Sequence, residues 1–107
     1  MRYMLTSLAD SAEPDDALFV EMGKFIQEMS AAGILLSTGG LEPGGRRIVS
    51  EGGEITVLDG PFAESKEAVV GFALVEVDSL EQVVELGRRF RRIVGDGTSV
   101  IQQVFGP

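Results

Sequence analysis

The segment "AVVGFALVEV", residues 68–77, decides the fold because it is the most apolar run in the chain. A short and nearly continuous apolar run predicts a strand that is buried at the centre of a sheet. Gly71 lies inside this run, and a glycine within a strand indicates a β-bulge or a close approach of a neighbouring backbone. The remaining elements are expected to pack around this strand.

Further strands are predicted on both sides of this segment. Residues 2–8 (RYMLTSL) favour an opening strand, residues 34–41 (ILLSTGGL) a second strand, and residues 100–105 (VIQQVF) a final one. Between the second strand and the central segment, "RRIVS" and "EITVL" are separated by Glu51-Gly52-Gly53. Two short strands joined by a glycine-containing loop are typical of a β-hairpin.

Two amphipathic helices are predicted between the strands. The first begins near Pro14 and Asp15, which suit an opening helical turn, and Gly33 is placed to end it. Its apolar residues recur at helical spacing: Leu18, Met22, Phe25, Ile26 and Met29. The second helix begins at Ser79, which forms the S-x-x-Q pattern of a capping box with Gln82. Its apolar residues gather towards one face: Leu80, Val83, Val84, Gly87 and Phe90.

This order of elements predicts the fold class. Without the hairpin it is the βαββαβ order of a ferredoxin-like α+β sandwich, and the 107 residues are expected to form a single domain, residues 1–107. Both helices then cover one face of an antiparallel sheet, and the other face stays bare. Residues 68–77 and 100–105 carry too many apolar side chains for a solvated face. We therefore expect a homodimer in which two sheets pack face to face.

The composition excludes several classes of function. The formal net charge of −8 makes nucleic acid an unfavourable partner. With no Cys there is no disulfide or thiol chemistry, and with no His there is neither a His-dependent catalytic triad nor an imidazole zinc site. No apolar run reaches the ~18–20 residues that span a bilayer, and the opening residues do not resemble a secretory signal peptide. A cytoplasmic protein without membrane association is expected.

The tetrapeptide Asp59-Gly60-Pro61-Phe62 lies between two apolar runs and has two interpretations. It is either a rigid turn with Phe62 packed in the core beneath it, or one wall of a small-molecule pocket. In the second interpretation Asp59 is the candidate catalytic general base, because burial at the mouth of a cleft raises the pKa of a carboxyl group towards neutrality. Gly60 and Pro61 would then shape the loop, and Phe62 would form a pocket wall.

Other polar residues are candidate contributors to the same pocket. Glu64, Lys66 and Glu67 follow the tetrapeptide closely and either orient a ligand or are solvated surface charges. Tyr3 shares a sheet face with Leu5 and Ser7, which makes it either a secondary pocket residue or a half-buried strand aromatic. The spacing of the carboxylates is not a metal-binding signature, and no metal or cofactor is predicted.

The segment "LDGPFAESKEAVVGFALVEVDSLEQV", residues 58–83, resembles the signature of the YCII-related, or DGPF-domain, family of small bacterial proteins. The resemblance extends to "RYMLTSL", "AAG" and "TGGL" earlier in the chain. It implies a dimeric α/β-barrel built from ferredoxin-like units. Related proteins have been proposed as enzymes because a His–Asp pair lies in a cleft. Asp59 matches the motif carboxylate, but this chain has no His to pair with it.

Two functional hypotheses follow. The first is a small-molecule pocket near residues 59–62 that either catalyses an unidentified reaction with other groups or binds without catalysis. The second is a non-catalytic protein-interaction module, because many members of the resembled family are encoded near extracytoplasmic-function sigma factors. The cluster Arg88-Arg89-Phe90-Arg91-Arg92 is compatible with both. Its arginines either complement the helix dipole and Glu85, or bind an anion or an acidic protein partner.

Overall fold

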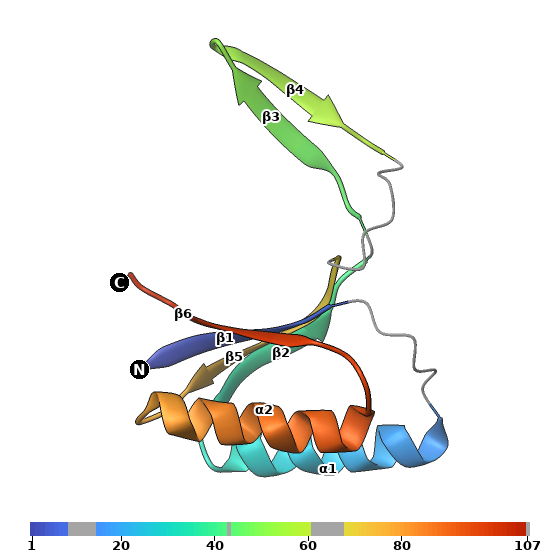
Figure 1. The fold of residues 1–107 in the computed structure, drawn as a ribbon, viewed down its shortest axis with the longest axis vertical. Helices are drawn as coiled ribbons and strands as arrows, with labels where there is room; N and C mark the ends of the chain where they lie inside the picture. Colours follow the sequence, from blue (N-terminus) through green and yellow to red (C-terminus); the bar gives the residue numbers. More distant parts are fainter. Residues whose placement is uncertain (9–14, 43, 61–67, 107) are drawn as a thin grey trace.

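The structure is a computed structural model that describes residues 1–8, 15–42, 44–60 and 68–106. The elements follow one another as predicted (Figure 1). They are β1 (Arg2–Leu8), α1 (Asp16–Ala31), β2 (Leu35–Gly40), β3 (Arg47–Glu51), β4 (Glu54–Leu58), β5 (Val69–Glu76), α2 (Leu80–Val94) and β6 (Ser99–Gln103). Neither described helix has the length and apolar character needed to cross a bilayer.

β5 lies inside a four-stranded antiparallel sheet with the order β2-β5-β1-β6. This position confirms the prediction that residues 68–77 form a central strand, and the strand order is that of a ferredoxin-like α+β fold. The register shifts where Ser7 pairs with Gly71 and Leu8 pairs with Val69. One residue of β5, Val70, is therefore extra, which confirms the predicted irregularity at Gly71.

Side-chain caps begin both helices. The Asp15 carboxylate accepts a hydrogen bond of 2.7 Å from the Leu18 amide at the start of α1, and Ser79 Oγ accepts one of 3.2 Å from the Gln82 amide at the start of α2. The Gln82 side chain accepts from the amide of Asp78 rather than from that of Ser79. These bonds satisfy amide groups that have no partner inside the helix.

The two helices cover one face of the sheet and enclose the core (Figure 1). The buried core side chains come from β1, α1, the end of β5, the residue just after it, and α2: Tyr3, Met29, Val75, Val77, Val83 and Leu86. The opposite face of the sheet, here called the open face, has no covering layer among the described residues. Strand alternation places on it the partly exposed side chains of Met4, Thr6, Phe72, Leu74 and Val100.

β3 and β4 form a separate two-stranded sheet, which we call the hairpin. Its loop is Gly52-Gly53, whose positive φ angles of 58° and 85° are those that a two-residue hairpin turn requires. The hairpin projects away from the helices, on the side of the open face (Figure 1). This projection gives the chain a radius of gyration of 16.0 Å, whereas a compact domain of this length has about 13 Å.

Candidate functional site

A cavity of about 190 Å³ lies between the sheet and the two helices. The helices contribute bulky apolar side chains to its wall: Met22, Phe25, Ile26, Met29, Leu86 and Phe90. The strands contribute Leu5 and Ser7 of β1, Leu35, Thr38 and Gly39 of β2, Gly71, Phe72, Ala73 and Val75 of β5, and Ser99 of β6.

Small residues on the sheet explain why this space is left open. Gly71 and Ala73 occupy positions of β5 that face the helices, and together they carry only one methyl group. The helix side chains opposite them do not fill the resulting gap. The bulge beside Gly71 lies at the same end of β5. The cavity is therefore a consequence of glycine and alanine in the central strand.

The polar groups on the cavity wall are hydroxyls. Thr38 donates a hydrogen bond of 2.9 Å to the carbonyl oxygen of Phe72. Ser7 and Ser99 are paired across β1 and β6. The Oγ atom of Ser99 is buried from solvent and has no hydrogen-bond partner among the described residues. In the described part of the chain, no group of three or more acidic side chains is placed to hold a metal ion.

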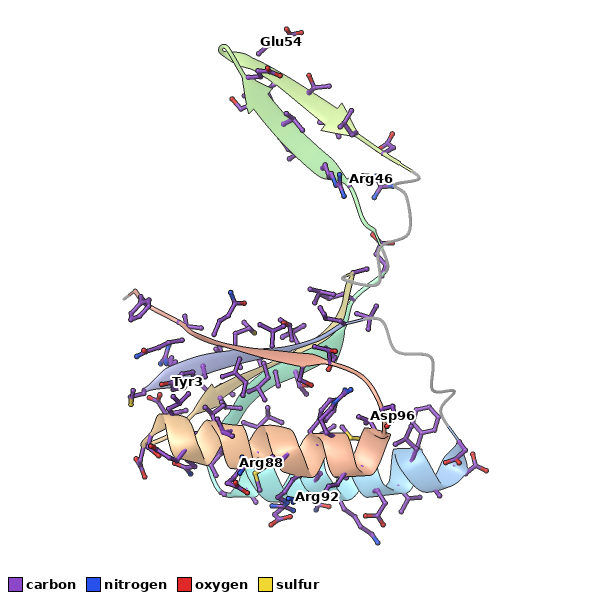
Figure 2. The ribbon with its side chains drawn as sticks, viewed as in Figure 1. Tyr3, Arg46, Glu54, Arg88, Arg92 and Asp96 are labelled. Carbon is purple, nitrogen blue, oxygen red and sulfur yellow. The ribbon has the colours of Figure 1, made fainter. Side chains whose placement is uncertain are left out.

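Asp59, the predicted catalytic residue, lies at the base of the hairpin and not on the described cavity wall. Its side chain is 77% exposed and accepts a hydrogen bond of 3.1 Å from Nε of Arg46, which Figure 2 shows at the hairpin base. The burial that would make it a general base is absent from the single chain. Gly60 follows with a φ of 84°, the left-handed conformation that glycine permits in a turn. Pro61, Phe62, Glu64, Lys66 and Glu67 lie outside the described residues.

Tyr3, the second candidate, is buried between the sheet and the helices with 5% of its surface exposed (Figure 2). It pairs with Val75 across β1 and β5 and belongs to the core. The predicted parity is correct, because Leu5 and Ser7 face the same side and line the cavity. Tyr3 itself is not among the described residues of the cavity wall.

The arginine cluster on α2 makes contacts within the protein. Arg88 pairs with Glu85, and Arg89 donates two hydrogen bonds, of 2.8 and 3.3 Å, to the carboxylate of Glu28 on α1. The hydrogen bonds and charge of Arg89 hold the pKa of Glu28 below its ordinary value. The Arg91 guanidinium lies 4.9 Å from the centre of the Phe90 ring. The Arg88–Glu85 pair is the predicted contact, whereas Arg89 pairs with Glu28 on the other helix instead of with Glu85.

The sequence patterns did not identify Thr38, Ser99 or the small residues of β5 as cavity residues. Ser7 and Ser99 are polar residues at strand positions that face inwards, and such positions are normally apolar. A polar residue at an inward-facing strand position is therefore the feature of the sequence that indicates this part of the cavity wall. It becomes visible only when the pairing of β1 with β6 is known.

Comparisons with known proteins agree with this architecture. The family model described as "YCII-related domain" matches residues 1–104. An uncharacterised protein of Rhizobium meliloti (strain 1021) is 47% identical over 36 residues, which are 34% of this chain and 29% of that protein. A solved structure of the 5-chloro-2-hydroxyhydroquinone dehydrochlorinase TftG from Burkholderia phenoliruptrix, in complex with 2,5-dihydroxybenzoquinone, superposes with a TM-score of 0.52. The superposition covers 100% of this chain and 96% of that one, at 11% sequence identity.

Proposed function

Because the chain belongs to the YCII-related domain family, we propose that it binds a small molecule in the cavity between its helices and its sheet. The observation that carries this proposal is a cavity of about 190 Å³ with a mainly apolar wall and a few hydroxyl groups. Ligand sites typically combine an apolar lining with a few polar groups in this way. An engineered apolar cavity of about 150 Å³ binds benzene, so this space suits a ligand with a single ring.

The likeness to the dehydrochlorinase supports a single-ring ligand, because the 2,5-dihydroxybenzoquinone bound in that complex is a substituted six-membered ring. At 11% identity the likeness extends to the fold alone, and no residue or reaction is transferred from that enzyme. An enzyme whose reaction is unidentified remains part of the proposal. Its acid–base chemistry would not use an imidazole, because the chain has no His.

Asp59 is retained as the proposed catalytic carboxylate. The segment after Gly60 leads directly into β5, and β5 lines the cavity at Gly71. This closeness in sequence to a strand of the cavity wall supports the proposed pocket role of residues 60–67. A general-base role also requires that a second copy remove Asp59 from water, because the carboxylate is exposed in one chain.

We further propose that two copies form a homodimer through their open faces, as in a dimeric α/β-barrel. The chain exposes 7725 Å² of surface, whereas a compact monomer of its mass exposes about 5,800 Å². The excess of roughly 1,900 Å² is more than the ~800 Å² that each partner buries in an interface of standard size. The open face and the hairpin project to the same side, so one partner can cover both (Figure 1).

Methyl NMR tests the ligand proposal, since Met22 and Met29 line the cavity whereas Met1 and Met4 do not. Titration with toluene should shift the methyl signals of Met22 and Met29 and leave those of Met1 and Met4 unchanged. Ala73→Leu should abolish the shifts by filling the cavity, and Ala17→Leu, at an exposed position of α1, should not. Equal shifts at all four methionines would refute a site in this cavity.

Light scattering tests the homodimer. The protein should have the mass of two chains at micromolar concentration. The variant Leu74→Glu, which is changed on the open face, should have the mass of one chain. Val20→Glu, at an exposed position of α1, is the matched control and should leave the dimer intact. A wild-type mass of one chain would exclude the homodimer.

That last outcome would favour the second candidate, a non-catalytic interaction module. The observation that favours this candidate is the partly exposed apolar side chains of the open face together with the exposed apolar residues of the hairpin. In that case the open face and the hairpin would bind a different protein. We propose that this protein is a component of an extracytoplasmic-function sigma-factor system. A candidate component would have to bind wild-type protein and fail to bind Leu74→Glu.

A further inference from the structure

The pairing of β1 with β6 brings two serine hydroxyls to one part of the cavity. Leu5 pairs with Ile101, and Ser7 pairs with Ser99 two residues further along. Leu5 and Ile101 point at α2, because a Cβ atom at Gly87 would lie 3.7 and 3.6 Å from their side chains. Residues two positions apart in a strand face the same side, so Ser7 and Ser99 also face the helices.

The hydroxyl of Ser99 requires an explanation. Its Oγ is buried from solvent and has no hydrogen-bond partner among the described residues. Buried hydroxyls nearly always have a partner, and one that lacks it lowers stability. Because the residue lines the cavity, rotation of its side chain to another staggered rotamer would turn the hydroxyl towards a group in the cavity.

The third hydroxyl on the wall differs from Ser99. The hydroxyl of Thr38 already donates to the carbonyl oxygen of Phe72. Its hydrogen is therefore committed to the backbone of the sheet, whereas Ser99 Oγ can both donate to and accept from a guest molecule. Thr38 is therefore not assigned to the polar group of a guest.

The described wall also excludes charged guests. Its residues include no acidic or basic side chain, and most are aliphatic or aromatic. An ion placed there would lose its hydration without gaining a counter-ion. A neutral polar group, in contrast, could be satisfied by the two serines.

We propose that the cavity binds a neutral single-ring compound with one hydroxyl or carbonyl group, and that Ser7 and Ser99 hydrogen-bond this group. The inference rests on the proposed function and specifies its ligand class. The apolar body of the ligand lies against Phe25, Met29 and Leu86, and its polar group lies at the serines. Phenol is the simplest molecule of this class.

The experiment compares phenol, toluene and benzoate as probes, with the signals of Met22 and Met29 as the readout. Wild-type protein should bind phenol and toluene and should not bind benzoate. Ser99→Ala and Ser7→Ala should each weaken phenol binding about tenfold, because the phenol hydroxyl loses a partner, and should change toluene binding less than about twofold. Ser50→Ala, the same change at an exposed position of β3 outside the described cavity wall, is the matched control and should change neither affinity by more than about twofold.

The outcomes separate the two proposals. If toluene binds but phenol does not, or if Ser99→Ala weakens both ligands equally, the serines do not recognise a polar group and this inference is overturned. Binding of benzoate would overturn the assignment of a neutral ligand. If none of the three probes shifts Met22 or Met29, the proposed binding site itself is wrong. Toluene binding by each variant shows that its cavity is still formed.

Discussion

The layer of four strands and two helices and the hairpin are built from similar residues but differ in what covers them. Val75 in β5 is 4% exposed, whereas Ile48 in β3 is 74% exposed. Both are β-branched residues that favour strands. The difference shows that residue type determines whether a strand forms, and that only the neighbouring layer determines whether its side chains are buried.

The hairpin therefore depends on local interactions and, in the proposed homodimer, on contacts with the partner chain. A two-stranded hairpin without a covering layer is marginally stable in water. Here it has a glycine turn at its tip, the Arg46–Asp59 ion pair at its base, and only exposed residues between them. We expect it to respond to mutation as a unit separate from the layer beneath it.

The largest contrast is expected from one substitution made in both regions. Val83→Ala removes two methyl groups from the fully buried core position of α2 and should lower the free energy of unfolding by roughly 2 kcal/mol. Val57→Ala makes the same change in the exposed hairpin and should alter the free energy of unfolding by less than about 0.5 kcal/mol. Urea denaturation measures both free energies of unfolding. Both variants also carry Leu74→Glu, so that the proposed dimer is absent. Equal losses would show that the hairpin is part of the core.

The next effect should stay within the hairpin. Gly52→Val forces a β-branched residue into a positive φ of 58° and should cost about 1–2 kcal/mol of hairpin stability. Hydrogen exchange at the amides of β3 and β4 should accelerate severalfold, while exchange in β1 and β5 stays slow. Faster exchange in β1 or β5 would contradict independent behaviour of the two regions.

A smaller effect is expected from the ion pair that joins the two helices. Arg89 lowers the pKa of Glu28 in the folded state. The ion pair therefore stabilises the fold at pH values above 4.5, which is the ordinary pKa of a glutamate. This contribution is lost as the pH falls through the lowered pKa. Glu28→Gln should therefore be slightly less stable than the wild type near pH 7 and equally stable in strong acid. Thermal unfolding at several pH values tests this, with Glu21→Gln as the control; a difference that does not vary with pH would contradict it.

The smallest change in stability is expected at the base of the hairpin. Asp59→Asn removes an exposed ion pair, and such pairs contribute about 0–1 kcal/mol. The variant should unfold like the wild type and should still bind toluene, because Asp59 does not line the described cavity. Once a reaction is found, turnover should be lost if Asp59 is the catalytic carboxylate. Loss of toluene binding would instead indicate that the Asp59 motif shapes the cavity.

Features that depend on neighbouring residues in the chain were predictable. The strand at residues 2–8 has the predicted bounds, and Ser79 caps α2 through Gln82 as expected. Within the helices the prediction was weaker. The helical spacing predicts Leu80 on the apolar face of α2, but it is exposed because the side chain of a first helical residue leans past the helix end. Leu86, which was not predicted, lies in the core.

Features that depend on the three-dimensional arrangement were not predictable from local patterns. The distance of Asp59 from the cavity follows from the direction in which the hairpin projects, and no residue of the hairpin encodes that direction by itself. The cavity combines residues of four strands and two helices, most of which are ordinary core residues by type. Its hydroxyls are recognisable only through the pairing of Ser7 with Ser99.

Phe72 belongs both to the cavity wall and to the open face. Its ring lies against Gly39, where an added Cβ atom would come within 3.1 Å of it, so a side chain at position 39 would require the ring to shift. Any coupling between binding in the cavity and self-association through this residue must be reciprocal. If a guest in the cavity strengthens self-association by some factor, self-association strengthens the binding of that guest by the same factor. The concentration of the protein would then set its apparent affinity for the ligand.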